Sequence, residues 1–316
     1  MGRLVIASQL NEIFNETLAR HVGDAEIIAL PPGSPQALPK DARILLAAPF
    51  RKAGGPLPES PPPGWPFDLR WVQLVSVGID FYPTWLFDGP VVTSARGSSA
   101  VALAEFALAA VFSAAKRLPD IWIKGAEQWR PTPLAIVEGQ TLGLVGFGSI
   151  GEALAPKALA LGLKVIAVRR SDRPIPVAGV ERVANIETLF EQSDHVVLAA
   201  PITAQTVGLV DRALLAHAKP GLHLINIARG ALIDDDALLE ALDAGRVSQA
   251  SLDVTHPEPL PAGHPYYSHP RVRLSPHTSV HTPQTRINLA AKFADNLSRF
   301  RQGAPLDDVV DLGRGY

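Results

Sequence analysis

Three glycines near the middle of the chain have the spacing of a phosphate-binding turn. Gly146, Gly148 and Gly151 form G-x-G-x-x-G in the stretch LGLVGFGSIGEAL, after an apolar segment and at the start of a helical one. The first glycine permits a tight turn, the second leaves room for a pyrophosphate, and the third lets helix and strand pack closely. A glycine triplet alone also occurs in ordinary turns. With a strand before it, a helix after it and a second strand beyond, it predicts a dinucleotide site.

That second strand, expected at residues 164–168, ends in Arg169, Arg170 and Ser171. In NAD-specific folds of this kind a carboxylate at this point binds the adenosine ribose, whereas an arginine accommodates a 2′-phosphate. The first carboxylate here comes only at Asp172. Two guanidinium groups and a hydroxyl can clamp a phosphate, although a solvated strand end is the plainer alternative. We therefore expect NADP(H) as the preferred cofactor, with NAD(H) possible.

The elements that must position these residues form a regular series. Short β-branched runs alternate with helical patterns, which predicts two α/β units with parallel sheets and crossover helices. A long helix is expected at 98–115 and another at 285–301, and the Pro- and Gly-rich segment 52–66 reads as a surface loop. The expected strands are 4–7, 26–30, 43–47, 71–75, 91–93, 141–145, 164–168, 195–199, 222–227, 249–253 and 272–274.

Composition excludes several other classes of protein. The 316 residues leave room for two domains, and 47% hydrophobic with 19% charged residues is typical of a globular chain. A net charge of −2 gives no overall attraction to nucleic acid or to an anionic membrane. The apolar run 100–115 carries Glu105 in its middle, so we expect a buried helix rather than a membrane span. The apolar run near residue 1 is too short for a signal peptide and is typical of a first strand, so a cytoplasmic enzyme is expected.

A metal site is the alternative raised by the histidines at 256, 264, 269, 277 and 281. The chain has no cysteine, which excludes thiolate catalysis, and it has no H-E-x-x-H spacing. We therefore expect no metal.

Five ordered stretches carry a family resemblance: SVGID, LVGFGSIG, INIARGALIDDDAL, SLDVTHPEPLP and LSPHTS. Together they resemble the D-isomer-specific 2-hydroxyacid dehydrogenases, and SVGID resembles the glyoxylate/hydroxypyruvate reductase branch. The resemblance runs from about Trp71 to the C-terminal tail. It implies an α/β fold of two Rossmann-like domains of the formate/glycerate dehydrogenase type, with the cofactor domain inserted into the substrate domain. We expect a substrate domain at 1–95 plus 284–316 and a dinucleotide-binding domain at 96–283.

The resemblance also implies a catalytic set of Arg229, Glu258 and His277. Reducing a 2-oxo acid needs a cation for the carboxylate and carbonyl oxygens, and the guanidinium fork of Arg229 suits both. An acid must protonate the developing alkoxide, and an imidazole such as that of His277 exchanges protons near neutral pH. Glu258 would accept the proton on the other ring nitrogen and favour the imidazolium.

Further contacts are implied by the resemblance alone. The N–H groups of Val77 and Gly78 would bind the substrate carboxylate, and Trp129 would lie near the substrate, in some relatives from a partner subunit. The implied cofactor contacts, besides the glycines, are Ser149, Ile150, Pro201, Thr206, Ala228 and Asp253. Thr255 and Ser94 depart from the Phe and Asn that the family often has, so packing near the site is expected to differ.

The activity expected is NADPH-dependent reduction of small 2-oxo acids such as glyoxylate and hydroxypyruvate to D-2-hydroxy acids. One alternative is an NAD-linked dehydrogenase of a larger or phosphorylated hydroxy acid, similar to 3-phosphoglycerate. Another is a nucleotide-sensing binding protein, because some relatives act as transcriptional corepressors. We expect a homodimer, with the helix at 98–115 as a possible interface.

Overall fold

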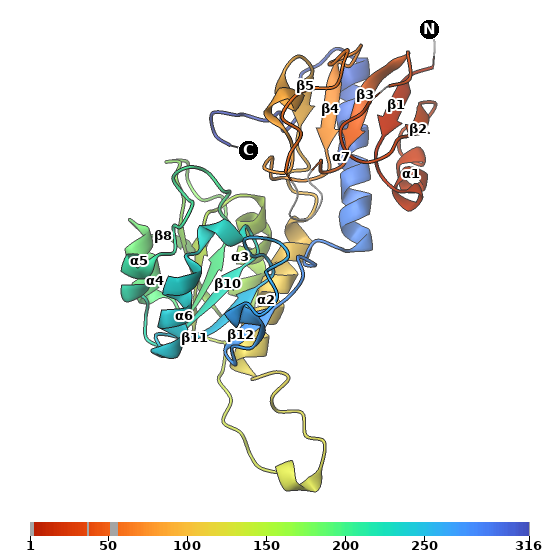
Figure 1. Ribbon diagram of the computed structural model, residues 1–316. Coiled ribbons are helices and arrows are strands. Elements are labelled where there is room, and N and C mark those ends of the chain that lie inside the picture. The colour runs from red at the N-terminus through yellow and green to blue at the C-terminus, as the bar shows by residue number, and fades with distance from the viewer. Residues whose placement is uncertain (1–2, 37, 51–55, 316) are drawn as a thin grey trace. The chain divides into compact units, whose positions relative to one another are not determined.

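A computed structural model of the chain describes residues 3–36, 38–50 and 56–315. The chain forms two compact units: unit 1 is Met1–Ser99 with His281–Tyr316, and unit 2 is Ala100–Val280 (Figure 1). The boundaries differ by a few residues from those expected after residue 95 and before residue 284. Among the contacts of the segment after residue 95 within unit 1 is a hydrogen bond of 3.0 Å from the Asn288 side-chain amide to the Ser98 carbonyl.

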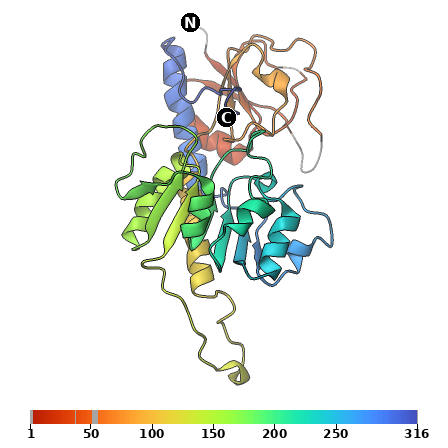
Figure 2. The same cartoon turned by 90° about the vertical axis from the view of Figure 1, so that its left-hand side faces the viewer.

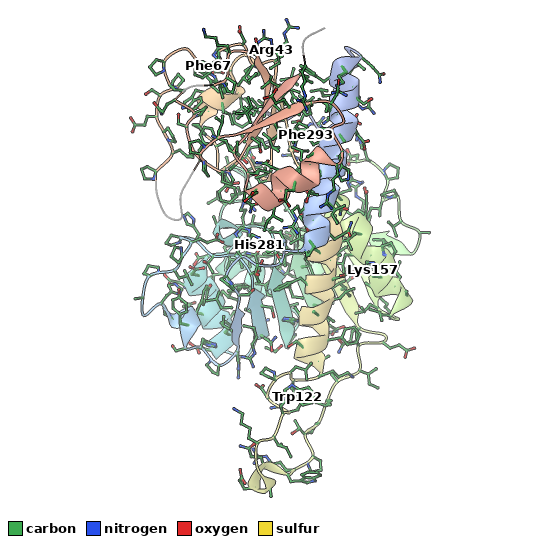
Figure 3. All side chains as sticks on the ribbon, turned by 90° about the vertical axis from the view of Figure 1, so that its right-hand side faces the viewer. Arg43, Phe67, Trp122, Lys157, His281 and Phe293 are labelled. Atoms are coloured by element: carbon green, nitrogen blue, oxygen red, sulfur yellow. The ribbon has the colours of Figure 1, made fainter. Side chains whose placement is uncertain are left out.

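Unit 1 is a five-stranded parallel sheet with the order β2-β1-β3-β4-β5, one of the common doubly wound arrangements. The helices α1 (Glu12–Ala19) and α7 (Pro283–Arg301) pack on one face, where Phe293 of α7 (Figure 3) stacks on Trp71 with ring centroids 4.7 Å apart. The 3₁₀ helix η1 (Thr84–Phe87) and aromatic loops cover the other face. The strands are β1 Val5–Ser8, β2 Glu26–Ala29, β3 Ala42–Ala47, β4 Trp71–Leu74 and β5 Val91–Thr93.

Unit 2 is a seven-stranded parallel sheet with the order β12-β11-β10-β9-β6-β7-β8. Counted from β6, this is the Rossmann order 3-2-1-4-5-6 with one further strand, and the order reverses between β6 and β9. The predicted fold of two Rossmann-like units, one inserted into the other, is confirmed. The strands are β6 Thr141–Val145, β7 Lys164–Val168, β8 Val180–Arg182, β9 His195–Leu198, β10 Leu222–Asn226, β11 Val247–Leu252 and β12 Val272–Leu274.

Helices cover both faces of this second sheet. Alternate residues of each central strand face opposite cores, as Val196 and Val197 of β9 do. The long helix α2 is Ala100–Ala115 and packs with α3 on one face. The remaining helices of unit 2 are α3 Ser149–Ala160, α4 Ile186–Gln192, α5 Arg212–Ala216 and α6 Asp235–Asp243, with the 3₁₀ helices η2 Ala126–Gln128, η3 Gly230–Leu232 and η4 Pro265–Tyr267.

The sequence prediction missed β8 at the edge of this sheet. Glu181 and Arg182 in it are exposed, so the strand has no apolar alternation to detect. It forms because β7 offers a free edge, with Ala167 paired to Arg182. The expected loop at 52–66 begins outside the described residues, and its described part, 56–66, contains no helix or strand. In the described ranges no helix is both long and apolar enough to cross a bilayer.

Two buried histidines lie side by side near the amino ends of β9 and β10. His195 Nδ1 lies 3.0 Å from His223 Nδ1, His195 Nε2 lies 2.7 Å from Gln140 Oε1, and His223 Nε2 lies 2.9 Å from Ser251 Oγ. If His195 donates to the Gln140 oxygen, its Nδ1 must accept from His223, whose Nε2 then accepts from Ser251. One neutral tautomer of each ring therefore satisfies the whole chain of hydrogen bonds. A proton added to His195 Nδ1 would face the Nδ1–H of His223.

A hairpin-like arm leaves unit 2 between α2 and β6. Its base is closed where the Ala135 N–H donates to the Ala115 carbonyl at 2.9 Å, and Arg273 pairs with Asp120 at 3.3 Å. Residues 121–134, which we call the arm, extend away from the sheet of unit 2 (Figure 2). The arm exposes large apolar side chains, with Trp122 at 66% and Trp129 at 80% exposure.

Candidate active site

The glycine motif follows β6, and each glycine has its own steric reason. Gly146 has φ of 92°, and a Cβ there would lie 2.9 Å from the Ala199 carbonyl oxygen. A Cβ on Gly148 would meet no described atom within 4 Å, so the space over it is open. A Cβ on Gly151 would lie 3.0 Å from the Phe147 ring, so this glycine packs on its own loop rather than on a strand. A tighter approach between a strand and a helix end lies at Gly143 of β6, where a Cβ would lie 2.2 Å from Ser193 Oγ, just after α4.

The helix after this motif begins without a capping side chain. Five other α-helices begin at residues whose side chains accept a backbone N–H: Asn11, Asn185, Asp211, Asp234 and Thr282. The N-cap of α3 is Gly148, which has no side chain. The N–H groups of its first turn, starting at Ser149 and Ile150, are thus left for another acceptor. Open space over Gly148 and an uncapped helix start fit a dinucleotide pyrophosphate.

The strand end after β7 carries mostly exposed positive charge. Arg169 donates to the Pro174 carbonyl at 3.3 Å, which folds the loop back on itself, and Arg170 and Ser171 are exposed. Asp172 forms an ion pair with Arg182 of β8 at 3.1 Å. The one carboxylate of this loop is therefore engaged by an arginine.

The loop after β9 contains two of the predicted cofactor contacts. The Thr206 hydroxyl donates to the Pro201 carbonyl at 2.8 Å, and the Thr203 N–H donates to the Thr206 oxygen at 2.7 Å. Thr206 thus closes this loop on itself. The parallel sheet brings it to the same edge as the glycine motif, since β9 is the neighbour of β6.

Arg229 lies just beyond β10, on a turn organised by a buried asparagine. The Asn226 amide nitrogen donates to the Arg229 carbonyl at 2.8 Å, and its oxygen accepts the Ala228 N–H at 3.0 Å. Asn226 is fully buried. The Arg229 guanidinium donates to the Ala228 carbonyl at 2.7 Å, the group expected to contact the cofactor. No motif in the sequence pointed to Asn226, although a polar residue that ends an apolar strand was a usable signal.

The next residue, Gly230, presses against the loop that carries Glu258. A Cβ at Gly230 would lie 1.9 Å from the Thr255 carbonyl carbon, so no other residue fits there without moving backbone. The Thr255 N–H donates to Glu258 Oε1 at 3.0 Å. Glu258 Oε2 lies 2.9 Å from His277 Nδ1. The turn bearing Arg229, the Glu258 loop and His277 are thus connected through short contacts within unit 2.

The electrostatics of this cluster favour an ionised Glu258. Partial burial raises the pKa of Glu258. The hydrogen bond and charge of His277, the Thr255 N–H and the charge of Arg229 together lower it by more, so the net pKa lies below its usual value. A carboxylate then faces His277 Nδ1, which must carry a proton to make the hydrogen bond. The pair holds His277 in one orientation, with Nε2 as the nitrogen able to exchange a proton with a ligand.

Asp253 anchors the loop that carries His277. His277 has φ of 50°, a left-handed conformation that is unfavourable for a side chain of this size. Its N–H donates to the Asp253 carbonyl at 2.8 Å. The buried Asp253 carboxylate accepts from Ser275 Oγ at 2.6 Å and from the N–H groups of Thr278 and Ser279 at 2.9 and 3.0 Å. Burial raises the pKa of Asp253, and these hydrogen bonds lower it to a net value below normal. Both carboxylate oxygens are therefore used inside the protein.

Val77 and Gly78 lie in unit 1, in the loop after β4. Val77 is 37% exposed, and within the described residues neither N–H group donates to an acceptor. Both are therefore able to bind an anion. Trp129 belongs to the arm of unit 2, and its 80% exposure means that the chain itself does not bring it to the catalytic cluster.

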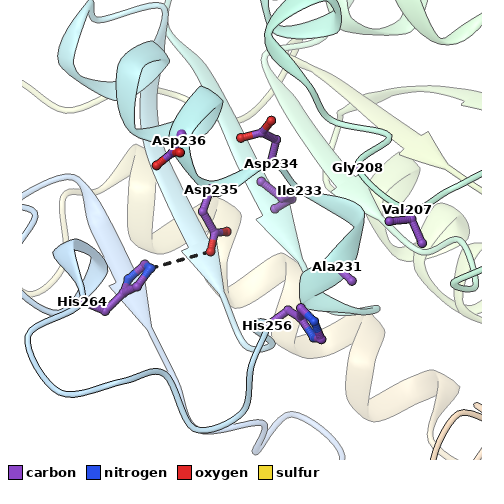
Figure 4. A pocket seen from close by; sticks show the side chains of 9 residues that line it. All are labelled: Val207, Gly208, Ala231, Ile233, Asp234, Asp235, Asp236, His256 and His264. Carbon is purple, nitrogen blue, oxygen red and sulfur yellow. Dashed lines mark ion pairs between the residues drawn. The ribbon is translucent and has the colours of Figure 1, made fainter.

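A pocket in unit 2 opens beside α6 (Figure 4). His264 Nε2 lies 3.7 Å from Asp235 Oδ2, and the Tyr266 hydroxyl donates to Asp235 Oδ1 at 2.9 Å. Burial raises the pKa of Asp235 more than these contacts lower it. The lining residues are Val207, Gly208, Ala231, Ile233, Asp234, Asp235, Asp236, His256 and His264. Of these, only His256 and His264 were considered from the sequence, in the metal alternative that was not favoured. The part of the chain that the structure describes has no cluster of three or more His, Asp or Glu able to hold a metal ion.

Comparison with known proteins agrees with this geometry. Residues 108–279 match the family described as "D-isomer specific 2-hydroxyacid dehydrogenase, NAD binding domain". The chain belongs to the D-isomer specific 2-hydroxyacid dehydrogenases. As a member it is an NAD(P)-dependent oxidoreductase that interconverts 2-hydroxy and 2-oxo acids, and unit 2 contains its nicotinamide-cofactor domain.

Relatives within the family carry more than one name. A glyoxylate/hydroxypyruvate reductase A of Serratia proteamaculans is 35% identical over 78% of this chain and 82% of its own length. A D-3-phosphoglycerate dehydrogenase of Bacillus subtilis is 34% identical over 71% of this chain but only 43% of its own length. A solved family member from Aeromonas salmonicida has a TM-score of 0.80 and 30% identity, covering 98% of this chain and 99% of that one. The predicted family and enzyme class are confirmed.

Proposed function

We propose that this dehydrogenase reduces glyoxylate, hydroxypyruvate and similar small 2-oxo acids to D-2-hydroxy acids with NADPH, and that His277 transfers the proton. The observation that carries the proposal is the 2.9 Å contact of His277 Nδ1 with Glu258 on a loop fixed by Asp253. This contact orients the ring and leaves Nε2 for the substrate. Relatives named glyoxylate/hydroxypyruvate reductase and glyoxylate reductase support the choice of substrate.

Each residue of the set has a distinct task in this reaction. Bound NADPH would supply the hydride. The N–H groups of Val77 and Gly78 bind the substrate carboxylate, and the Arg229 guanidinium spans the carboxylate and carbonyl oxygens. His277 Nε2 donates its proton to the carbonyl oxygen as negative charge develops there, while Glu258 stabilises the imidazolium before the transfer. In the oxidation direction His277 accepts the proton from the hydroxyl.

The cofactor preference rests on the loop after β7. Arg169, Arg170 and Ser171 offer donors for a 2′-phosphate, and the first carboxylate of the loop comes only at Asp172, which pairs with Arg182 at the surface. The N–H groups of Ser149 and Ile150 bind the pyrophosphate. Pro201, Thr206 and the Ala228 carbonyl are further proposed contacts, and Asp253 acts through the loop that it anchors.

We also propose a homodimer. The arm exposes Trp122, Trp129 and Leu134, at 66%, 80% and 47% exposure, which is apolar surface that a second copy could cover. In such a dimer Trp129 would contact the partner. The mass in solution tests this, since a monomeric mass would overturn the dimer.

Initial rates test the activity directly. NADPH and NADH oxidation would be compared with glyoxylate, hydroxypyruvate, pyruvate, phenylpyruvate and 3-phosphohydroxypyruvate. We expect NADPH with a small oxo acid to be favoured by about tenfold or more in kcat/KM. Equal or better use of NADH would make the NAD-linked alternative correct, especially with the phosphorylated substrate, as the relatives named D-3-phosphoglycerate dehydrogenase suggest. No turnover with any pair would favour a nucleotide sensor.

A further inference from the structure

The loop after β4 contains a flexible residue where the proposed chemistry needs a rigid one. Gly78 has no side chain, and glycine samples more backbone conformations than any other residue. The N–H groups of Val77 and Gly78 can bind a carboxylate together only if their peptide planes keep one orientation. Something outside the backbone must therefore restrict this loop.

Ser76 supplies the first restriction. Its hydroxyl donates a hydrogen bond to the Gly78 carbonyl at 2.7 Å, which closes the loop and fixes the peptide plane that follows Gly78. Ser76 itself is fixed, because its carbonyl accepts the Ala95 N–H at 3.0 Å next to β5. The backbone of Ser76 is therefore fixed by β5, and its hydroxyl in turn restricts Gly78.

Tyr82 supplies the second restriction from beneath the loop. Its hydroxyl donates to the Ala47 carbonyl at the end of β3, at 3.2 Å, and lies 3.4 Å from Ser76 Oγ. The same Ala47 carbonyl accepts the Val75 N–H at 3.3 Å, so the phenol joins β3 to the loop that follows β4. Tyr82 is 3% exposed, and its ring packs 5.9 Å from that of Phe50. The hydroxyls of Tyr82 and Ser76 thus both donate hydrogen bonds to backbone carbonyls within unit 1.

We infer that Tyr82 and Ser76 are positioning residues that hold the Val77 and Gly78 N–H groups in the orientation that binds the substrate carboxylate. They act through the loop and do not touch the reacting atoms. The inference rests on the proposed function, because it assumes that this loop binds a 2-oxo acid. It predicts that loss of either hydroxyl weakens substrate binding while leaving cofactor binding and the proton transfer at His277 intact.

Tyr82→Phe and Ser76→Ala test this in the full-length enzyme. Each is expected to raise KM for the 2-oxo acid about three- to tenfold, the effect of one lost hydrogen bond, with kcat changed less than about twofold and KM for NADPH unchanged. In the double variant, KM for the 2-oxo acid should rise no more than in the more severe single variant, because both hydroxyls act on the same loop. Ser76→Thr keeps the hydroxyl and should restore KM. Tyr267→Phe is the matched control, since its hydroxyl also bonds a backbone carbonyl, that of Leu260, at 3.1 Å in unit 2.

The outcomes separate the two proposals. A wild-type enzyme with no 2-oxo acid turnover overturns the proposed function and this inference with it. An active wild type whose KM is unchanged by Tyr82→Phe and Ser76→Ala overturns the inference alone. A fall in kcat together with a rise in KM for both substrates, accompanied by a lower melting temperature, would show a merely structural role and would overturn it too.

Discussion

Two loop systems at the carboxyl edge of the unit 2 sheet are built in opposite ways. The catalytic system around His277 is held by buried groups, with Asn226 fully buried and Asp253 at 1% exposure. The loop after β7, with Arg169 and Arg170, is mostly exposed and relies on surface contacts such as the Asp172–Arg182 pair. The difference fits the tasks that we propose for the two loop systems. Proton transfer needs fixed distances, whereas choosing between a phosphate and a hydroxyl needs mainly charge.

The largest effect should come from His277 itself. We expect His277→Asn to lower kcat by about 10²- to 10⁴-fold, the usual contribution of a general acid, with little change in melting temperature. Glu258→Gln should lower kcat less, because a neutral amide still accepts the Nδ1 hydrogen bond but no longer stabilises the imidazolium. Steady-state rates with the preferred oxo acid measure both. Wild-type turnover in His277→Asn would remove this residue from the mechanism.

Two glycines on the same sheet edge should behave in opposite ways. Gly230→Ala places a Cβ 1.9 Å from Thr255 backbone, so we expect a loss of about 3 kcal/mol in the free energy of unfolding and a large fall in turnover. Gly148→Ala places its Cβ in open space, so stability should be unchanged while KM for the cofactor rises. Urea unfolding and cofactor titrations would be run on both variants. A stable, active Gly230→Ala enzyme would show that the Thr255 contact is not tight in solution.

The buried histidine pair lies at the opposite edge of the unit 2 sheet, near the amino ends of the strands. It tests whether burial alone makes the free energy of unfolding depend on pH. Burial lowers the pKa of His195 from 6.5 to about 4, although the charge of Asp194 opposes this. The unfolded chain therefore binds a proton first as the pH falls, so the stabilisation is complete above pH 6.5 and declines toward pH 4. We expect His195 to contribute a loss of about 3 kcal/mol over that range, measured as urea unfolding against pH. His195→Gln should flatten the slope; an unchanged slope would contradict the assignment.

The exposed loop should give the smallest effects. Arg169→Ala combined with Arg170→Ala is expected to lower kcat/KM with NADPH by about 10- to 100-fold, the value of lost charge-assisted hydrogen bonds, and to leave NADH almost unchanged. Asp172→Asn is the control, since an exposed ion pair contributes at most about 1 kcal/mol. Steady-state kinetics with both cofactors measure the ratio of kcat/KM for NADPH to kcat/KM for NADH. An equal loss with NADPH and NADH would mean that the loop affects folding rather than cofactor choice.

The sequence was most informative where local pattern and structure agree. Eleven of the observed strands correspond to apolar runs, and the glycine triplet indicated the turn after β6. The strand β8 was missed because its residues are exposed and it forms only by pairing with β7. Asn226, Gly230 and Tyr82 were not assigned their structural roles for a related reason. Each depends on contacts with residues far along the chain, and no local spacing records them.

By itself, the sequence determined the fold class, the family and the chemical types available at the site, because periodicity and motifs are properties of neighbouring residues. Only the tertiary structure decided which groups meet. It placed Glu258 against His277, used both oxygens of Asp253 to hold a left-handed histidine, and joined Tyr82 to Ser76 and Ala47. Such contacts depend on how the strands pair and on what is buried between them, and those are decided only when the whole sheet has formed.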